Sequence, residues 1–158
     1  MERTTILAEI LDFIPEYRDD FKRLNAEWMS VYFGKSMDTH LENPEETILK
    51  DGGFILFAKA DEQIVGTAAI LRETAKIYEI ADMAVTPQYR GQNIGKQLLA
   101  EAVERVKKMG ARQVYLITSS KLSASVELYR TYGFRETHFD PEMSIYEGSD
   151  IKMILNLK

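Results

Sequence analysis

The chain has 158 residues, which suits one domain over residues 1–158, because single cores usually span roughly 100–200 residues. Hydrophobic residues make up 45% and charged residues 28% of the chain, as in an ordinary globular protein, and the absence of cysteine excludes a disulfide framework, a thiolate nucleophile and Cys-ligated metal centres. With 20 Lys and Arg against 25 Asp and Glu, the formal net charge is -5, which argues against nucleic acid as a partner.

The first third of the sequence predicts a short strand and two helices. Residues 4–8 form the candidate strand. Pro15 suits the first turn of a helix, where its fixed φ and missing N–H cost nothing. The apolar residues that follow recur at helical spacing: Tyr17, Phe21, Leu24 and Trp28. Pro44, with two glutamates after it, predicts a shorter helix that ends near Gly52 and Gly53.

The middle of the chain has the pattern of strands. Short apolar runs predict strands over residues 54–58, 64–71 and 77–85. Residues 61–63 form a turn between the first two strands, and Pro87 closes the third.

The most strongly periodic segment of the sequence begins at Ile94 and predicts a helix that ends at Gly110. Its apolar stripe consists of Ile94, Leu98, Leu99, Ala102, Val103, Val106 and Met109. Beyond it we predict a strand over residues 114–118, a helix over 123–132 ended by Gly133, and strands over 134–138 and 150–157. This order predicts an α/β or α+β fold, in which helices cover a mixed sheet.

The segment before this helix is the most informative: Gln88-Tyr89-Arg90-Gly91-Gln92-Asn93-Ile94-Gly95-Lys96. Glycine allows a tight turn, and the free N–H groups and dipole of a helix's first turn attract an anion. Arg90 and Lys96 add two cations, so the segment predicts a pyrophosphate site, although Gly91 and Gly95 could merely shape a strand-to-helix turn. Neither a P-loop nor a Rossmann fingerprint fits the glycine spacing.

This segment resembles the phosphate-binding turn of the GNAT superfamily of acyl-CoA-dependent N-acetyltransferases, whose signature is Gln/Arg-x-x-Gly-x-Gly/Ala. Gln88 and Gly91 match it, whereas Asn93 replaces the usual Gly or Ala; because Asn tolerates left-handed backbone, we expect the turn to persist. Residues 79–85 resemble the family's fourth strand, and residues 128–134 resemble its Leu-Tyr-x-x-x-Gly-Phe helix end. The resemblance implies a mixed, mostly antiparallel sheet of six to seven strands with helices on both faces.

The resemblance also implies the chemistry. It implies acetyl-CoA as co-substrate, no metal, and direct attack by an amine in a ternary complex, and the chain has no cysteine that could carry an acetyl group. It places the cofactor at the end of the fourth strand, with the N–H of Met83 as oxyanion donor and Val85 against the pantetheine. It makes Glu79 the candidate general base and Tyr129 the candidate general acid. Ser120 stands near the place of an Asn that contacts pantetheine in many members.

Strand alternation predicts that Glu79 shares a face with Ala81, Met83 and Val85, where apolar neighbours would raise its pKa. Each candidate also has an interpretation in which its role is only structural. Glu79 could pair with a Lys or Arg, and Tyr129 could pack as part of a helix stripe. Ser120 and Ser123 could be strand-end and helix-cap residues.

In the family the acceptor groove is built by the first two helices, their connecting loop and the last two strands, which here means residues 28–40 and 139–149. The candidate acceptor residues are Tyr32, Asp38, His40 and Tyr146. Carboxylates with aromatics suit a cationic amine, although acidic residues also populate ordinary solvated surfaces. His40 and His138 have no metal-ligand spacing, and the seven methionines are typical of core filler.

We therefore expect an acetyl-CoA-dependent N-acetyltransferase that acts on a primary amine of a small molecule or peptide, as a monomer or homodimer in the cytoplasm. Two alternatives are a non-catalytic acyl-CoA-binding regulatory module and a partner-binding domain without a cofactor. We expect no membrane partner, because no apolar run approaches the roughly 18 residues needed to span a bilayer and the N-terminus lacks a signal-peptide pattern.

Overall fold

A computed structural model of the chain describes residues 5–32, 43–140, 142 and 149–157. Its centre is one seven-stranded sheet with the strand order β1-β2-β3-β4-β5-β7-β6. The strands are β1 (Glu9–Asp12), β2 (Phe54–Ala60), β3 (Gln63–Arg72), β4 (Ile77–Val85), β5 (Gln113–Thr118), β6 (Arg135–Thr137) and β7 (Ile151–Asn156). All neighbours pair antiparallel except β4 and β5, which are parallel. The mixed, mostly antiparallel sheet predicted from the resemblance is confirmed.

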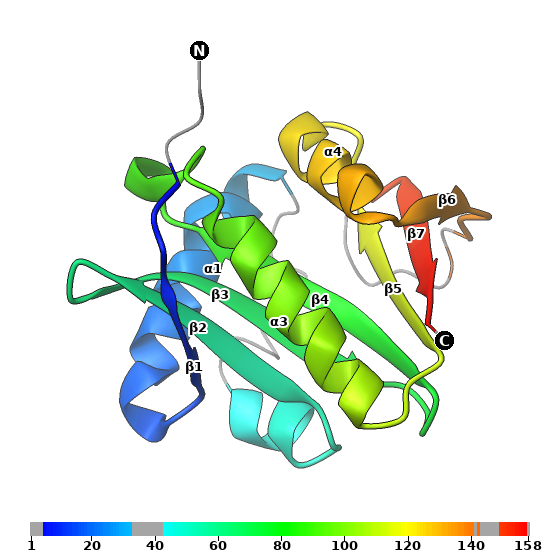
Figure 1. The fold of residues 1–158 in the computed structure, drawn as a ribbon, viewed down its shortest axis with the longest axis horizontal. Coiled ribbons are helices and arrows are strands. Elements are labelled where there is room, and N and C mark those ends of the chain that lie inside the picture. Colours follow the sequence, from blue (N-terminus) through cyan, green and yellow to red (C-terminus); the bar gives the residue numbers. More distant parts are fainter. Residues whose placement is uncertain (1–4, 33–42, 141, 143–148, 158) are drawn as a thin grey trace.

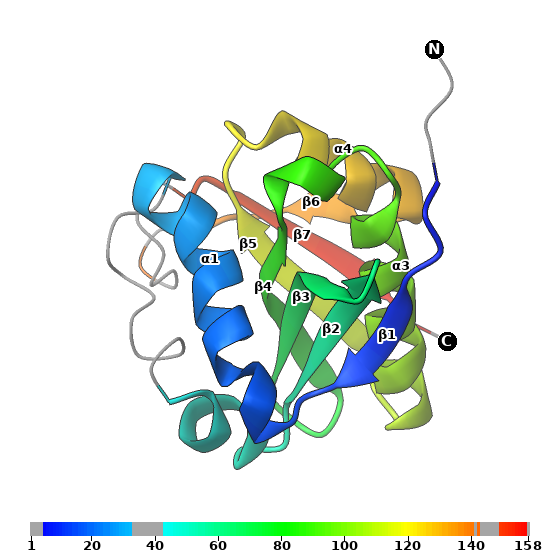
Figure 2. The same cartoon turned by 90° about the vertical axis from the view of Figure 1, so that its left-hand side faces the viewer.

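Helices cover both faces of this sheet, as predicted. They are η1 (Pro15–Tyr17), α1 (Arg18–Tyr32), η2 (Glu45–Leu49), η3 (Pro87–Tyr89), α3 (Ile94–Lys108) and α4 (Ser123–Tyr132). Figures 1 and 2 show α1 on one face of the sheet and α3 with α4 on the other. In the described part of the chain, every helix is too short or too polar to cross a bilayer.

Two apolar clusters hold the layers together, one on each face. On the α3 face the buried stripe of α3 packs against Leu56 and Ala58 of β2, and on the α1 face Phe21 packs with Ile55 and Phe57. The alternation along β2 therefore sends neighbouring side chains into different cores. Met109, which the periodicity placed on the stripe, follows the last helical residue and is 44% exposed.

The first strand begins later than predicted, at Glu9 instead of within residues 4–8. Residues 5–8 bind the first turn of α3: Gln97 Nε2 donates to the Ile6 carbonyl at 2.7 Å, and Gln97 Oε1 accepts from the Ala8 N–H at 3.0 Å. The Ile6 N–H donates to the Gln92 carbonyl at 3.2 Å. Because these backbone groups bind α3, they do not extend the sheet.

A β-bulge interrupts β4 at Ala81. Ile70 of β3 pairs with Ile80, but the preceding residue, Ala69, pairs with Asp82, so Ala81 is the extra residue. A bulge of this kind reverses the alternation of side chains beyond it.

The bulge corrects the predicted face of Glu79. Glu79 pairs with Leu71, and Asp82 pairs with Ala69; both partners pack in the cluster on the α1 face. Met83 pairs with Ala68, which belongs to the core on the α3 face. Glu79 and Asp82 therefore share the α1 face, whereas Met83 and Val85 face α3, because the extra residue Ala81 breaks the strand alternation between them.

Candidate active site

The site lies where β4 and β5 separate. Their parallel pairing covers only Ile77–Ile80 against Gln113–Leu116, although β4 continues to Val85. A cleft of about 490 Å³ opens beyond the last pair. Its lining consists of residues 80–85, 89–91, 93–96, 116–118, 121–125, 128 and 129. Strand ends that part in this way leave backbone groups of β4 without a strand partner on that side, and such groups can bind a ligand.

The turn before α3 forms one wall of the cleft in the conformation that its sequence requires. Gly91 has φ +80° and Asn93 has φ +64°, so both are left-handed. Asn93 keeps the turn that Gly or Ala usually forms in the family, as we expected from its tolerance of this region. A Cβ at Gly91 would meet no atom within 4 Å, so the backbone there is open to an approaching ligand.

Three cationic side chains surround the mouth of this cleft. Arg90, Lys96 and Lys121 all line it and are exposed. Arg90 Nε donates to the Val85 carbonyl at 3.1 Å, which holds the guanidinium beside the end of β4. Lys121 precedes α4, and sequence reasoning missed it because no periodicity or motif marks this loop. Together with the first turns of α3 and α4, these cations suit an anionic ligand.

Gly95 allows the two helices and β4 to approach one another. The position its Cβ would take lies 3.4 Å from Leu128 and 4.0 Å from both Met83 and Val85. Tyr129, on the same helix as Leu128, lines the cleft and is 7% exposed, and burial raises the pKa of its hydroxyl. Its ring packs on Phe134 at 6.0 Å between centroids, so the structure gives Tyr129 both the predicted place in the cleft and the packing role.

Ser120 lies outside the lining of the cleft and is bound elsewhere. Its N–H donates to Asp150 Oδ1 at 2.7 Å and its hydroxyl donates to Asp150 Oδ2 at 2.6 Å. The Asp150 N–H donates to the Thr118 carbonyl at 3.0 Å. The two bonds from Ser120, that of its hydroxyl first, hold the pKa of Asp150 below its usual range, and they fix the loop that carries Lys121.

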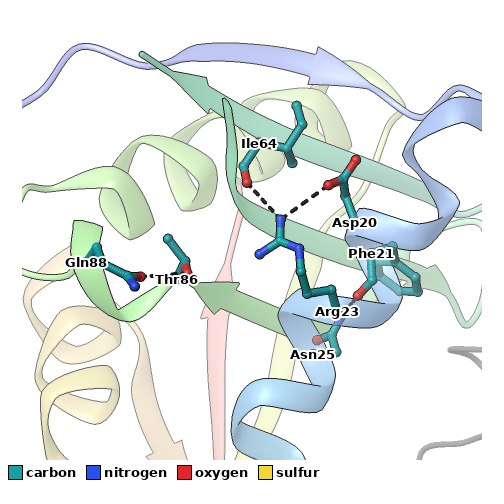
Figure 3. A network of polar contacts seen from close by, with 7 residues as sticks. All are labelled: Asp20, Phe21, Arg23, Asn25, Ile64, Thr86 and Gln88. Atoms are coloured by element: carbon teal, nitrogen blue, oxygen red, sulfur yellow. Dashed lines mark hydrogen bonds and ion pairs between the residues drawn. The ribbon is translucent and has the colours of Figure 1, made fainter. Parts of the chain in front are cut away.

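Gln88 and Gln92 also lie outside the lining of the cleft. Gln88 Oε1 accepts from the Thr86 hydroxyl at 3.1 Å and lines a second, polar pocket of about 820 Å³ beside α1. Figure 3 shows this region, in which Arg23 Nη2 donates to Asp20 and to the Ile64 carbonyl. The structure thus brings together Met83, Val85, Arg90, Gly91, Asn93, Ile94, Gly95, Lys96 and Tyr129 of the predicted set.

Glu79 lies opposite Tyr115 of β5, at the last part of the β4–β5 pairing. The Tyr115 hydroxyl donates to Glu79 Oε1 at 3.5 Å, and Lys152 Nζ lies 4.7 Å from the centroid of the Tyr115 ring. Burial, reinforced by the Glu73 carboxylate, raises the pKa of Glu79 to about 7, against smaller opposing effects of Tyr115 and Lys152. Glu79 is thus partly paired, yet it has the pKa of a general base that works near neutral pH.

Asp82 was not predicted, and it is the most buried charged residue near the site. Its side chain is 1% exposed, and neither carboxylate oxygen has a hydrogen-bond partner among the described residues. Burial, with a smaller effect of Glu79, raises the pKa of Asp82 to about 7. Its sequence signal was an acidic residue inside an apolar strand, three positions after Glu79.

The predicted acceptor residues lie outside what the structure describes. Asp38, His40 and Tyr146 are not among the described residues, and Tyr32 is described only as the end of the α1 backbone. His138 is exposed after β6. Within the described residues, no three His, Asp or Glu side chains are grouped so that they could hold a metal ion.

Comparisons with known proteins agree on one family. Residues 14–134 match the model of the Acetyltransferase (GNAT) family. An amino-acid acetyltransferase of Aeromonas salmonicida is 36% identical over 83 residues, which are 51% of this chain and 16% of that protein. The chain spans between 16% and 50% of the length of the first curated relatives that it matches.

Solved structures share the whole fold. A GNAT-family acetyltransferase of Staphylococcus aureus superposes with a TM-score of 0.84 at 24% identity, over 96% of this chain and 100% of that chain. An N-acetyltransferase of Thermoplasma acidophilum, solved in complex with coenzyme A, superposes with a TM-score of 0.76 at 20% identity, over 96% of this chain and 100% of that chain.

Proposed function

Since the chain belongs to the acetyltransferase (GNAT) family, we propose that it transfers an acetyl group from acetyl-CoA to a primary amine of a small molecule or peptide, by direct attack in a ternary complex. The observation that carries this proposal is the cleft at the separation of β4 and β5. Its cationic wall lies on the α3 face of the sheet, and β4 carries a carboxylate of raised pKa, Glu79, on the α1 face, one residue before the cleft lining begins.

The residues of the α3 face fit coenzyme A. The left-handed turn at Gly91 and Asn93 is open to a ligand, and Arg90, Lys96 and Lys121 supply positive charge at the mouth. A pyrophosphate needs this combination of free helix N–H groups and cations. The coenzyme A in the structure of similar fold from Thermoplasma acidophilum supports the same ligand here.

Acetyl-CoA supplies an activated acetyl group as a thioester, and the residues at the end of β4 then have few tasks. The backbone N–H of Met83 would stabilise the negative charge that develops on the thioester oxygen. Tyr129 would donate a proton to the departing sulfur, since it lines the cleft and its hydroxyl carries a proton at neutral pH. Val85 would contact the pantetheine of the cofactor, and the turn at Gly91 and Asn93 would hold its pyrophosphate.

Glu79 would take a proton from the acceptor, which arrives as an ammonium ion. The amine nitrogen then forms a bond to the carbonyl carbon while the carbon–sulfur bond breaks, and the second proton that the nitrogen loses replaces the one that Tyr129 gives to the sulfur. The products are the amide, the thiol of coenzyme A and one proton released to solvent. A carboxylate with a pKa of about 7 is matched to this transfer near neutral pH.

An acceptor screen tests the proposal. The purified chain is incubated with acetyl-CoA and a panel of amino acids, polyamines, aminoglycosides and peptides, and released thiol is measured with a disulfide reagent. Acetylation of any amine, with loss of thiol release in Glu79→Gln and retained binding of coenzyme A, supports it. Tight binding of acetyl-CoA without turnover on any acceptor would favour an acyl-CoA-binding regulatory module, and the absence of any thermal shift with acetyl-CoA would refute both.

A further inference from the structure

The carboxylate of Asp82 is costly for the fold. Its side chain is 1% exposed, and both oxygens lack a hydrogen-bond partner within the described residues. A buried polar group left unpaired typically destabilises a protein by about 1–3 kcal/mol, and a charged one by more. A hydrophobic residue of similar volume would suit this position between the sheet and α1 better, so packing alone does not explain an aspartate there.

The bulge at Ala81 brings this aspartate to the side of Glu79. In a regular strand, residues three apart point to opposite faces. Here the extra residue puts Asp82 on the same face as Glu79, as their partners Ala69 and Leu71 show. Asp82 also belongs to the lining of the cleft, at the point where β4 and β5 have parted. Glu79 and Asp82 thus lie on one face of β4, with Asp82 in the lining of the cleft and Glu79 in the last part of the pairing with β5.

The groups around these carboxylates come from several elements. Glu73, in the turn before β4, adds a negative charge that acts on Glu79, while Tyr115 of β5 and Lys152 of β7 act in the opposite direction. On α1, which packs over this face, the described residue Asn25 is fully buried and donates to the Phe21 carbonyl at 2.9 Å. No cation among the described residues makes an ion pair with Asp82, and burial favours the protonated form of its carboxyl.

We propose that Glu79 and Asp82 act as one proton-holding pair, in which Glu79 takes the proton of the acceptor ammonium and Asp82 is a positioning residue that holds a second proton site beside it. This rests on the proposed function for the role of Glu79. Because neighbouring carboxylates do not readily ionise together, the pair keeps one proton near neutral pH and a net charge of -1. The ammonium gives one proton to the ionised member, and the pair returns one proton to solvent after the amide has formed. The raised pKa values of both residues agree with this arrangement.

The pair can be tested by NMR without knowing the acceptor. The side-chain carboxyl carbons of Asp82 and Glu79 are assigned by triple-resonance experiments on the full chain and followed against pH. In the wild-type protein we expect Asp82 to titrate in two steps around neutral pH. In Glu79→Gln the curve should collapse to one step, displaced to lower pH by about one unit. Asp51, an exposed aspartate outside the cleft, serves as the control whose curve should be the same in both proteins.

A reciprocal measurement keeps the test valid if Glu79→Gln does not fold. The side-chain carboxyl carbon of Glu79 is followed against pH in Asp82→Asn, and its titration should likewise change from two steps to one. An Asp82 curve that does not respond to Glu79→Gln overturns the pair, even if an amine is acetylated. Coupled titration combined with no acetylation of any amine overturns the proposed function and, with it, the proton-taking role.

Once an acceptor is found, the pH profile of kcat/KM gives a readout that a merely structural aspartate would not change. Asp82→Asn should move the acidic limb of the profile to lower pH, because Glu79 then ionises without a competing neighbour. A uniform loss of activity at every pH, with the limb unmoved, would contradict a role through Glu79.

Discussion

The two faces of β4 carry opposite chemistries. On the face toward α3, the strand presents Met83 and Val85 to a cleft whose mouth is cationic and whose wall is a left-handed turn. On the face toward α1, it presents Glu79 and Asp82, with pKa values raised to about 7 by burial and by neighbouring carboxylates.

A single strand with one extra residue separates these two environments. Because the pairing with β5 ends at Ile80, groups from the two faces can meet at the open end of the strand without passing around the sheet. The difference between the faces therefore supports two separate roles. The α3 face would bind the anionic cofactor, and the α1 face would accept the proton of a cationic acceptor.

The largest effect is expected in the free energy of unfolding, through Asp82 on the α1 face. Burial raises the pKa of Asp82 from its ordinary value of 3.8 to about 7, so the folded protein binds the extra proton between these values. The stability that this proton contributes is complete below about pH 4 and is lost as pH rises to 7, at a cost of roughly 4 kcal/mol at most. In Asp82→Asn this part of the loss should vanish, which urea unfolding at a series of pH values would measure.

The matched control is Asp51→Asn, which removes the same charge from an exposed site. If the stability of Asp82→Asn falls with rising pH as steeply as that of the wild type, Asp82 is not protonated in the folded protein. The α1 face would then lack the second proton site that distinguishes it from the α3 face.

The next effect concerns the α3 face, where Tyr129→Phe should lower kcat by about 100-fold while binding of coenzyme A stays the same, because only the departing sulfur loses its proton donor. Steady-state kinetics and calorimetry separate these two quantities. Tyr132→Phe, on the same helix but outside the cleft lining, is the control. An unaltered kcat in Tyr129→Phe would leave Tyr129 with its packing role on Phe134 alone.

A smaller effect is expected in the turn. Gly91→Asp should weaken binding of coenzyme A by about tenfold, because a carboxylate would stand against the pyrophosphate. Gly91→Asn is the matched control: it has the same size and a similar tolerance of φ +80°, but no charge. Equal affinities of the two variants, measured by calorimetry, would show that the pyrophosphate does not lie at this turn.

The smallest effect is expected at the mouth. Lys121→Gln should weaken binding of coenzyme A by about threefold at low salt and less at high salt, since exposed charges are screened. Lys108→Gln, exposed at the far end of α3, should have no effect. If both variants behave alike at low salt, net charge and not the position of Lys121 governs binding.

Much of the fold could be predicted because its signals are local. The α3 stripe, the turn at Gly91 and the end of α4 at Gly133 follow from periodicity and from the demands of left-handed backbone, and each is found where it was predicted, except for Met109 at the end of the stripe. The late start of β1 could not be read from residues 4–8, since it depends on hydrogen bonds to Gln97, which is about 90 positions away.

The site was predictable to a lesser extent for the same reason. The wall of the cleft is one continuous segment, and the family signature marks it. The α1 face depends on a bulge at Ala81 and on Tyr115 from another strand, which arise from pairing between strands and leave no periodic signal. Glu79 was therefore found through the resemblance, whereas Asp82 and Tyr115 emerged only from the three-dimensional structure.

Asn93 has a consequence for how the protein is handled in the laboratory. Its left-handed backbone shapes the turn, and its side-chain amide donates to the Thr5 hydroxyl at 2.7 Å, while Gln97 binds the next residues of the same segment. The beginning of the described chain is thus tied to the wall of the cleft. A fusion partner or affinity tag joined just before Thr5 would therefore stand next to the bond between Thr5 and Asn93, and a tag at the other end of the chain is the better choice for measuring affinity for coenzyme A.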